Sequence, residues 1–460
     1  MKLSEYASSL MNLTVGVVGL GVSNRPLVEY LCKHGVTVIG RDRTSREDMG
    51  AAADHLEALG AKLILGCGYL EDLTEDVIFR SPGIRPDLPE FVAAQKRGAV
   101  LTSEMEVFFD VCPCKIIAIT GSDGKTTTTT IVSELLKAEG YRVHLGGNIG
   151  TPLLTQADEM RADDLVVVEL SSFQLMTMRK SADVAVVTNL APNHLDVHRS
   201  MEEYTEAKMN IFLHQKGRGV TVLNADNAIT AAFSPLCTGD VRTFSRKSVV
   251  NQGFYAENGT IFSASNGVST AMMQEDDIFL PGKHNVENFL AAFSAVDGIV
   301  STETMKKVAK EFRGVEHRIE FVRMLDGVKY YNDSIASSPS RTIAGLHAFD
   351  QKVILIAGGK DKGVPFDELG KEICDHTKAV VLTGYTAEKL YNAVTGAVNY
   401  REDIPVRVTE GFDEAIYAAR DIAMPGDVVI LSPACTSFDR FKNFAHRGET
   451  FKNIVNGMEE

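Results

Sequence analysis

The sequence is short of positive charge. Its 460 residues include 47 lysines and arginines against 61 aspartates and glutamates, which gives a formal net charge of −14 at pH 7. Surfaces that bind nucleic acid or anionic membranes need clustered lysine and arginine side chains. We therefore expect no general affinity for nucleic acid, and any phosphate group that the chain binds must be bound locally.

Long apolar runs and paired cysteines are also missing. No run approaches the ~20 apolar residues of a membrane-spanning helix, and the first residues lead into a strand-like segment without the cleavage site of a secretory signal. Of seven scattered cysteines only Cys112 and Cys114 lie close together, in a C-P-C spacing that fits neither a redox pair nor a zinc site. We expect a cytoplasmic protein with reduced thiols and no membrane insertion, in which these two are linker or core thiols.

Length and composition favour several folded domains. A chain of 460 residues, 44% of them hydrophobic, exceeds the size at which one hydrophobic core stops growing. Strand-like apolar runs alternate with amphipathic stretches, which is typical of α/β folds. We predict a Rossmann-like domain at residues 1–105, a central P-loop domain at residues 106–311 with a small antiparallel patch, and a Rossmann-like domain at residues 312–460.

A glycine turn follows the first predicted strand, residues 14–18. It reads G-L-G-V-S-N, and a helical stretch comes next. Asn24 stands where a dinucleotide-binding fingerprint has its third glycine, so an NAD site is not secured, while Asp42 lies about where the ribose-binding acid would be. The turn predicts a nucleotide site or, alternatively, glycines that only allow tight packing of helix against strand.

The strongest local motif is T-G-S-D-G-K-T-T at residues 120–127. It lies between an apolar strand, residues 115–120, and a helical stretch that begins at Thr126. Its glycines let backbone N–H groups surround phosphate oxygens, Lys125 can reach the outer phosphates, and the Thr126 hydroxyl can bind Mg²⁺. The alternative is a glycine-rich turn without a ligand.

Three further residues are candidates for the same site. Glu169 ends the apolar strand DLVVVEL, His194 follows another strand, and Lys208 lies on the helical stretch after it. A carboxylate at a strand end can bind Mg²⁺ but is often only a solvated terminus, a single histidine is more often structural, and a helix lysine is usually solvated. Their proximity to the phosphate loop favours a metal site.

These segments together resemble the Mur ligase family. The ordered motifs are GLGVSN, SPGI, TGSDGKTT, GNIG, ELSSFQL, NHLDVH, KHNVEN, HRIE, NDS and SPACTSFDRFKNFAHRG. Within the family, ELSSFQL at residues 169–175, GNIG at residues 147–150 and the block that begins at Ser432 favour the member that adds D-glutamate. The resemblance implies a monomeric, ATP-dependent amide ligase of peptidoglycan precursor synthesis that joins D-glutamate to UDP-N-acetylmuramoyl-L-alanine.

The resemblance also implies contacts for both nucleotides. Those for the UDP substrate are Val22, Ser23, Asn24, Asp42, Arg43, Ser81, Pro82, Gly83, Asn148 and Ser171. Those for ATP are Gly121, Ser122, Asp123, Gly124, Lys125, Thr126, Thr127, Asn285 and Asn288, with Arg318 and Asp333 from the third domain.

Two Mg²⁺ sites are implied as well. Thr126 and Glu169 would hold one ion, and His194 and a carbamylated Lys208 the other. Carbamylation matters because an unmodified lysine is positively charged and would repel a metal, whereas its carbamate is an anionic oxygen ligand. Lys125, His194 and Lys208 are the implied catalytic residues.

The third domain is expected to bind D-glutamate. The implied contacts are Ser337, Lys362, Ser437, Phe438 and Phe444. Cationic and hydroxyl donors suit a small dianion with an amine. Lys360 remains an alternative to Lys362, because both lie in G-G-K-D-K-G.

Two residues depart from the family pattern. Ile335 stands where many relatives carry lysine, which removes one expected cationic contact. Asn193 precedes His194 where an acid is common, although its side chain can still accept a hydrogen bond.

The motifs predict a reaction through an acyl phosphate, and they leave alternatives. The L-alanyl carboxylate would attack the γ-phosphorus of ATP, and the amine of D-glutamate would open the product, with release of ADP and phosphate.

Another Mur-type or a folylpolyglutamate-type ligase would share the phosphate loop and metal site. From a different class, an NAD-dependent oxidoreductase would leave TGSDGKTT unused, and a non-catalytic nucleotide-binding module would not need Lys208 and His194.

Overall fold

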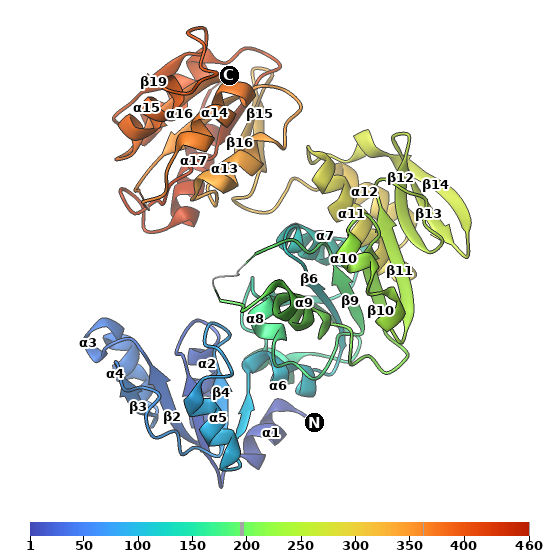
Figure 1. Ribbon diagram of the computed structural model, residues 1–460, viewed down its shortest axis with the longest axis vertical. Coiled ribbons are helices and arrows are strands. Elements are labelled where there is room, and N and C mark those ends of the chain that lie inside the picture. Colours follow the sequence, from blue (N-terminus) through green and yellow to red (C-terminus); the bar gives the residue numbers. More distant parts are fainter. Residues whose placement is uncertain (194–196, 362, 460) are drawn as a thin grey trace. The chain divides into compact units, whose positions relative to one another are not determined.

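The computed structural model describes residues 1–193, 197–361 and 363–459 and divides into two compact units (Figure 1). Unit 1 consists of Met1–Glu275 and Glu287–Val308, and unit 2 of Asp276–Val286 and Ala309–Glu460. The chain forms three sheets flanked by helices, so the predicted α/β class is confirmed. The boundaries predicted after residues 105 and 311 stay predictions. In the described ranges, no helix is long and apolar enough to cross a membrane.

The first sheet of unit 1 is parallel, with strand order β3-β2-β1-β4-β5. Its strands are β1 (Thr14–Val18), β2 (Thr37–Asp42), β3 (Lys62–Leu65), β4 (Val77–Arg80) and β5 (Val100–Thr102). Its helices are α1 (Leu3–Ser9), α2 (Asn24–Lys33), α3 (Arg46–Met49), α4 (Ala51–Ala58), α5 (Pro89–Lys96) and α6 (Glu104–Val111). The strand order reverses between β1 and β4, where ligands bind in such sheets.

The second sheet of unit 1 has the strand order β14-β13-β12-β11-β10-β9-β6-β8-β7. Its parallel strands are β6 (Lys115–Thr120), β7 (Val143–Gly147), β8 (Leu165–Glu169), β9 (Val184–Val187), β10 (Val220–Asn224), β11 (Asp240–Ser245) and β12 (Gly253–Glu257), and β13 (Thr260–Ser265) and β14 (Val268–Gln274) are antiparallel. β6 is therefore central, with β8 and β9 as its neighbours.

Helices connect strands of this second sheet or follow its last strand, β14. They are α7 (Lys125–Glu139), α8 (Ser172–Leu175), α9 (Met201–Met209), α10 (Ala228–Ala231), α11 (Lys283–Val296) and α12 (Thr302–Glu311), with short 3₁₀ turns at Leu154–Glu159, Ser234–Leu236 and Glu275–Asp277. α7 begins after Gly124 and ends before Gly140, and both glycines have left-handed backbone angles that favour glycine, with φ of 76° and 104°.

Unit 2 contains the third sheet, with strand order β15-β16-β20-β17-β18-β19. Its strands are β15 (Glu320–Leu325), β16 (Val328–Asn332), β17 (Val353–Gly358), β18 (Thr377–Thr383), β19 (Val406–Val408) and β20 (Val428–Leu431), of which only β15 is antiparallel to its neighbour. Its helices are α13 (Pro339–Leu346), α14 (Asp367–His376), α15 (Ala387–Thr395), α16 (Phe412–Ile422) and α17 (Phe444–Gly457).

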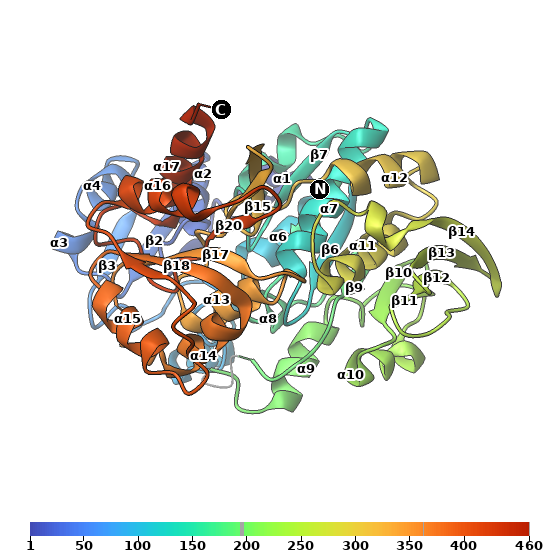
Figure 2. The ribbon, with the colours of Figure 1, turned by 90° about the horizontal axis from the view of Figure 1, so that it is seen from above.

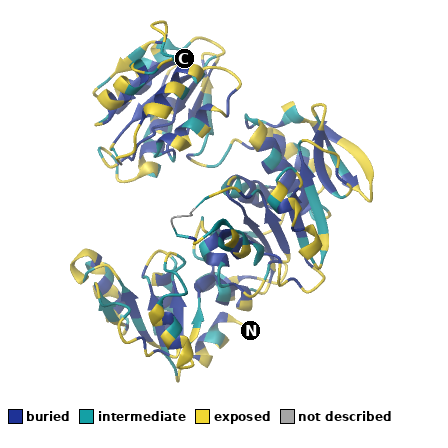
Figure 3. Ribbon diagram, viewed as in Figure 1, coloured by how far each residue is buried: buried dark blue, intermediate teal, exposed yellow. Residues whose placement is uncertain are grey.

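Two apolar cores hold this third sheet between its helices. Along the buried strand β17, Leu355 packs with α13, α14 and α15, whereas Ile354 and Ile356 pack with α16 and α17. Figure 2 shows these two helix layers on either side of the sheet, and Figure 3 shows its buried strands. A strand buried on both faces explains why residues 353–356 read as an unbroken apolar run.

All seven cysteines have free thiols. Cys114 is buried and Cys112 is half-buried, and their sulfur atoms are 3.6 Å apart between α6 and β6. They lie in a core and a connection between elements, as predicted.

Candidate active site

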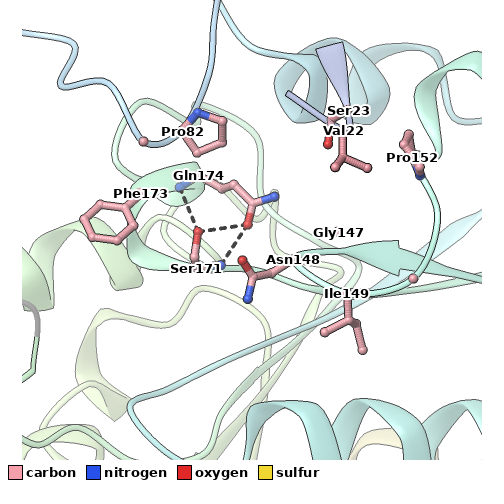
Figure 4. Close-up of a pocket in the computed structure, with 12 residues that line it drawn as sticks. Val22, Ser23, Pro82, Gly147, Asn148, Ile149, Pro152, Ser171, Phe173 and Gln174 are labelled. Carbon is pink, nitrogen blue, oxygen red and sulfur yellow. Dashed lines mark hydrogen bonds between the residues drawn. The ribbon is translucent and has the colours of Figure 1, made fainter. Parts of the chain in front are cut away.

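A pocket of about 390 Å³ lies in unit 1 where the first sheet's loops meet those of the second (Figure 4). Six of the ten residues predicted to bind the UDP substrate line it together: Val22, Ser23, Pro82, Gly83, Asn148 and Ser171. They come from the loops after β1, β4, β7 and β8, four segments that are far apart in the sequence. The structure thus brings these residues to one pocket.

Sequence reasoning missed the other half of the lining. These residues are Gly147, Ile149, Gly150, Pro152, Phe173 and Gln174. Most lie inside the GNIG and ELSSFQL motifs, so the signal was present but was used only to identify the family. Ser171 caps α8, because its hydroxyl accepts from the Gln174 backbone N–H at 3.3 Å and its own N–H donates to Gln174 Oε1 at 2.9 Å (Figure 4).

Arg80 is a second omission. From the end of β4 its buried guanidinium donates to the carbonyl oxygens of Ser81, Pro82 and Ile84 at 3.1, 3.2 and 2.5 Å, and to that of Phe173 at 3.3 Å. Burial lowers the pKa of Arg80 to about 10. This side chain fixes the turn on one side of the pocket and ties it to α8 on the other.

The remaining predicted substrate residues do not line the pocket. Asn24 is buried and donates to Gly19 O at 2.8 Å, Ser81 N–H donates to Val18 O at 2.8 Å, and Arg43 is exposed after β2. Asp42 accepts from Leu20 N–H at 2.6 Å. Burial raises the pKa of Asp42, but hydrogen bonds from Thr44 and Leu20 and the charge of Arg25 outweigh it, so the net shift is downward. Asn24, Ser81 and Asp42 shape the glycine turn.

The phosphate loop, residues 120–127, connects β6 to the N-terminus of α7. Gly121 has φ of 151°, and a Cβ there would lie 1.9 Å from Thr188 Oγ1. The loop is fastened to the segment after β9, where Ser122 Oγ donates to Ala191 O at 3.0 Å and Asp123 N–H donates to Asn189 Oδ1 at 2.9 Å. Lys125 Nζ donates to Ser122 O at 2.9 Å, and Thr127 is buried in the first turn of α7. A loop held by these hydrogen bonds leaves the helix N-terminus available for an anion.

Thr126 and Glu169 meet beside the loop. The Thr126 hydroxyl donates to Glu169 Oε2 at 2.7 Å, and Asn148 Nδ2 donates to Oε1 of the same carboxylate at 2.7 Å. Glu169 is 1% exposed at the end of β8. Asn148 therefore joins the pocket to the phosphate loop through one carboxylate. A hydroxyl and a carboxylate oxygen are suitable ligands for Mg²⁺.

Lys208 is buried on α9, contrary to the usual solvated helix lysine. Its Nζ donates to Gly121 O at 2.8 Å and to Thr120 Oγ1 at 3.0 Å, and the side chain lies over the Tyr204 ring. Burial lowers the pKa of Lys208 well below its ordinary value, repulsion from Lys125 adds to this, and the charges of Glu169 and Asp123 oppose it. This amine is therefore positioned directly under the phosphate loop.

The predicted metal ligand His194 lies outside the described residues, but His198 of the same motif is described. His198 is buried, its Nε2 is 2.8 Å from Ser172 Oγ, and its ring stacks on Phe173 with centroids 5.1 Å apart. His198 thus connects α8, which borders the pocket, to the segment that leads into α9.

Helix α11 brings one predicted adenine contact to the phosphate loop. Thr128 Oγ1 donates to Asn288 Oδ1 at 3.2 Å, and a Cβ on Gly124 would lie 2.4 Å from the same oxygen. Asn285 lies one turn earlier on α11, is buried, and donates to Pro281 O at 2.7 Å.

The other predicted ATP residues, Arg318 and Asp333, lie together in unit 2. Asp333 is 4% exposed after β16, and it accepts from Ser432 Oγ at 2.7 Å and from Ile319 N–H at 3.3 Å. Burial raises the pKa of Asp333 to about 7, although these hydrogen bonds and the charge of Arg318 oppose the shift.

The residues predicted to bind D-glutamate lie around the carboxyl ends of the third sheet, except that Lys362 lies outside the described residues. Ser337 precedes α13, Ser437 is 2% exposed, and Phe438 and Phe444 are 64% and 40% exposed. Lys360, the alternative to Lys362, is exposed after β17, where its backbone pairs with Thr436.

Sequence reasoning also missed Arg447, which is buried on α17. It donates from Nε to Ser334 Oγ at 3.0 Å and from Nη1 to Cys435 O at 3.1 Å. Burial lowers the pKa of Arg447 to about 10. The side chain holds the loops after β16 and β20 together, as Arg80 does for the pocket in unit 1.

Two parts of the chain, one in the central region and one in unit 2, match models of the same protein family. Residues 119–296 match the family model described as the Mur ligase middle domain, and residues 317–435 match the model described as Mur ligase, glutamate ligase domain. The UDP-N-acetylmuramoylalanine–D-glutamate ligase of Acetivibrio thermocellus is 50% identical over 462 residues, which span 100% of this chain and 99% of that protein. The enzyme of the same name from Clostridium novyi is 50% identical over 457 residues, 99% of each chain.

Solved structures agree at the level of the fold. A UDP-N-acetylmuramate–alanine ligase from Thermotoga maritima has a TM-score of 0.57 and 18% identity, covering 97% of this chain and 100% of that one. A MurF ligase from Thermotoga maritima in complex with ADP has a TM-score of 0.56 and 16% identity, covering 96% and 95%.

Proposed function

The chain belongs to the Mur ligase family, and we propose that it joins D-glutamate to UDP-N-acetylmuramoyl-L-alanine in an ATP-dependent step of peptidoglycan precursor synthesis. It would act as a monomer in the cytoplasm, with residues 1–105 binding the UDP substrate, residues 106–311 ATP, and residues 312–460 the amino acid. The ADP complex of a solved relative supports the assignment of the nucleotide.

One observation carries the chemical part of the proposal. Asn148 lines the pocket and donates to Glu169, which in turn accepts from Thr126 at the start of α7. A carboxylate at the inner end of a substrate in the pocket would therefore approach the outer phosphate of a nucleotide on the loop. Proximity of this kind is the main contribution that a protein makes to phosphoryl transfer.

The proposed reaction has two steps. An oxygen of the L-alanyl carboxylate attacks the γ-phosphorus of ATP, the bond to the β–γ bridging oxygen breaks, and ADP leaves. The D-glutamate amine then attacks the carbonyl carbon of the acyl phosphate, loses a proton, and expels phosphate. Lys125 and the loop N–H groups would bind the phosphate oxygens, which neutralises part of their charge.

The residues at the loop also fit a divalent cation. The Thr126 hydroxyl and the Glu169 carboxylate supply adjacent oxygens, and His194 and Lys208 would supply a second site. Mg²⁺, when bound, offsets the negative charge that accumulates during phosphoryl transfer.

We propose that Lys208 is carbamylated in the active enzyme. Its buried amine donates to two oxygens of the phosphate loop, Thr120 Oγ1 and Gly121 O. Addition of carbon dioxide with loss of a proton would convert this amine into an anionic oxygen ligand. Protein supplied with ¹³C-labelled bicarbonate is expected to show one carbamate carbon signal by NMR. The same signal in the Lys208→Arg variant would contradict the assignment, because arginine forms no such adduct at this site.

The amino acid would be bound in unit 2. Ser337, Ser437, Phe438 and Phe444 lie around the carboxyl ends of the third sheet, and together with Lys362 or Lys360 they would offer the hydroxyl and cationic donors that a dianion needs. Arg318 and Asp333 would contact ATP, and Asn285 and Asn288 its adenine.

The test is phosphate release from ATP in the presence of UDP-N-acetylmuramoyl-L-alanine and one amino acid at a time. Turnover with D-glutamate alone, and a product whose mass is that of the glutamyl adduct, is the expected result. L-Glutamate, L-lysine, meso-diaminopimelate and no amino acid are the controls. Turnover with a different amino acid would keep the family and refute the specificity, and no turnover despite ADP binding would favour a non-catalytic nucleotide-binding module.

A further inference from the structure

Two histidines and one glutamate converge on the surface of unit 2, away from the residues assigned above. His347 caps the C-terminus of α13, and Glu372 and His376 lie one turn apart on α14, so both face the same side of that helix. α13 and α14 lie side by side (Figures 1 and 2). We call these three residues the histidine cluster.

Their donor atoms point at one place. His347 Nε2 is 2.6 Å and His376 Nε2 is 3.4 Å from the same oxygen, Glu372 Oε2. The two imidazole rings are 4.5 Å apart between centroids, and the three donor atoms lie within 4.8 Å of one another. Zinc–ligand bonds of about 2.0–2.1 Å at tetrahedral angles separate donor atoms by about 3.3 Å. Small side-chain rotations therefore convert this cluster into a ligand set.

The backbone around the cluster also favours a cation. α13 ends at Leu346 and α14 ends at His376, so the negative ends of two helix dipoles are directed at the three side chains. The side chains are 49%, 31% and 35% exposed, which leaves a path for an ion from solvent. Partial exposure also keeps the cost of placing a charge there low.

A second cluster of possible metal ligands in unit 2 is a poor candidate for a metal site. Glu316, His317 and Glu449 also place three donor atoms together. The Lys452 ammonium, however, lies 2.8 Å from each of the two carboxylates, so a positive charge already occupies that position. Among the described residues around the histidine cluster, no ion pair with a lysine or arginine is found.

The ligand types select the metal. Imidazole nitrogen suits Zn²⁺, Cu²⁺ and Ni²⁺, whereas Mg²⁺ prefers oxygen ligands and retains its waters. We propose that His347, Glu372 and His376 form a binding site for a divalent transition-metal ion of the Zn²⁺ class, with one coordination position left for water. The ion would fasten the C-terminal end of α13 to α14 and would be independent of the magnesium required for ligation.

The test is Zn²⁺ binding to the full-length protein, measured by competition with a chromogenic chelator at fixed ionic strength. The matched variants are H347Q/H376Q, which removes both imidazoles, and H55Q, which removes a histidine that faces only one carboxylate, Glu29, at 3.4 Å. Because loss of even an outer partner of a metal ligand weakens binding roughly 10–100-fold, the double variant is expected to lose one equivalent of tightly bound Zn²⁺. H55Q is expected to retain it.

Thermal unfolding supplies an independent readout. Zn²⁺ is expected to raise the unfolding midpoint of the wild type and of H55Q, but not that of H347Q/H376Q, since a ligand that binds only the folded state stabilises it. The response to Mg²⁺ should be the same in all three proteins. E372Q, which keeps the shape of the side chain and removes its charge, replaces the double variant if that variant unfolds without metal.

Equal Zn²⁺ stoichiometry and affinity in the wild type, H347Q/H376Q and E372Q would overturn the proposal. The cluster would then be a hydrogen-bonded surface contact between two helices, and the bound Zn²⁺ would belong to thiols or to the magnesium ligands. Loss of one equivalent in H347Q/H376Q and not in H55Q supports it.

Discussion

Thr126 contributes one hydroxyl to both the phosphate loop and the Glu169 carboxylate. Replacing it by alanine removes a proposed magnesium ligand and leaves the loop backbone in place. We expect Thr126→Ala to raise the Mg²⁺ concentration needed for half-maximal phosphate release by roughly 10-fold or more. Thr126→Ser keeps the hydroxyl and should behave nearly as the wild type. Equal Mg²⁺ dependence of all three proteins would exclude Thr126 as a ligand.

Glu104 illustrates a different residue-scale effect, in stability. It is buried at the start of α6, and burial raises its pKa from an ordinary 4.5 to about 7, although a hydrogen bond from Leu154 N–H opposes the shift. The folded state therefore binds this proton more tightly than the unfolded state, and the contribution of Glu104 to stability falls as the pH rises from about 4.5 to about 7.

The corresponding variant is Glu104→Gln, which removes the ionisation. We expect it to be more stable than the wild type at pH 8 by about 1–3 kcal/mol, and the difference to shrink at pH 5, as measured by urea unfolding. Glu90→Gln changes an exposed glutamate in the first turn of α5 and is the control. A difference that is the same at both pH values would show that Glu104 is ionised in the folded protein.

At the scale of elements, helix α7 offers a matched pair of glycines. Gly124 and Gly140 flank it and both have left-handed backbone angles. Alanine at either position should cost about 1–2 kcal/mol of stability from the backbone angle alone. Only at Gly124 would the new methyl group also meet a neighbour, Asn288 Oδ1, at 2.4 Å, whereas it meets nothing within 4 Å at Gly140.

We therefore expect similar backbone strain in both variants but a change in nucleotide binding in one. Gly124→Ala should weaken ADP binding at least about tenfold, equivalent to about 1.4 kcal/mol, and Gly140→Ala should leave it unchanged. Isothermal titration calorimetry with Mg²⁺ and ADP measures both. Equal affinities would mean that the Gly124–Asn288 contact does not shape the site.

Individual elements show how far sequence patterns can predict this fold. The strands predicted at residues 14–18 and 115–120 have those bounds in the structure. Each is mostly apolar and is followed by a glycine, which is a local signal. β2 (Thr37–Asp42) instead continues over the polar residues Arg41 and Asp42, because pairing with β1 and β3 extends it beyond its apolar residues.

Local sequence patterns predicted the functional site less completely than the fold. The family was predicted from ordered motifs, and the comparisons confirm it. Arg80 and Arg447 were missed because a buried arginine that donates to several carbonyl groups has no sequence signature. The burial of Lys208 likewise depends on tertiary contacts, because α9 packs against α8 and the Lys208 amine reaches Thr120 at the end of β6, whereas the helix sequence itself is typical of a solvated helix.

At the scale of the whole molecule, the proposed ligands fall into different units. The pocket and the phosphate loop belong to unit 1, and the proposed D-glutamate residues belong to unit 2. Hydrogen exchange can show which unit binds which ligand, because a bound ligand slows the local opening that exposes backbone N–H groups.

We expect UDP-N-acetylmuramoyl-L-alanine alone to slow exchange in residues 19–24, 81–84, 147–152 and 171–174, and to leave residues 309–459 unchanged. Mass spectrometry of peptic fragments measures this. UDP alone and D-glutamate alone are the comparison ligands in the same experiment. Protection that begins in unit 2 with the UDP substrate alone would contradict the proposed division of binding between units.

The contact between α7 and α11 has a consequence for the biosynthesis of the protein. Thr128 and Asn288, which meet beside the phosphate loop, are separated by 160 residues. At a translation rate of about 5–20 residues per second, the ribosome needs on the order of ten to thirty seconds to travel from one to the other. Nascent chains stalled before residue 288 should therefore fail to retain ADP, and the growing polypeptide would acquire its nucleotide only in the last third of its synthesis.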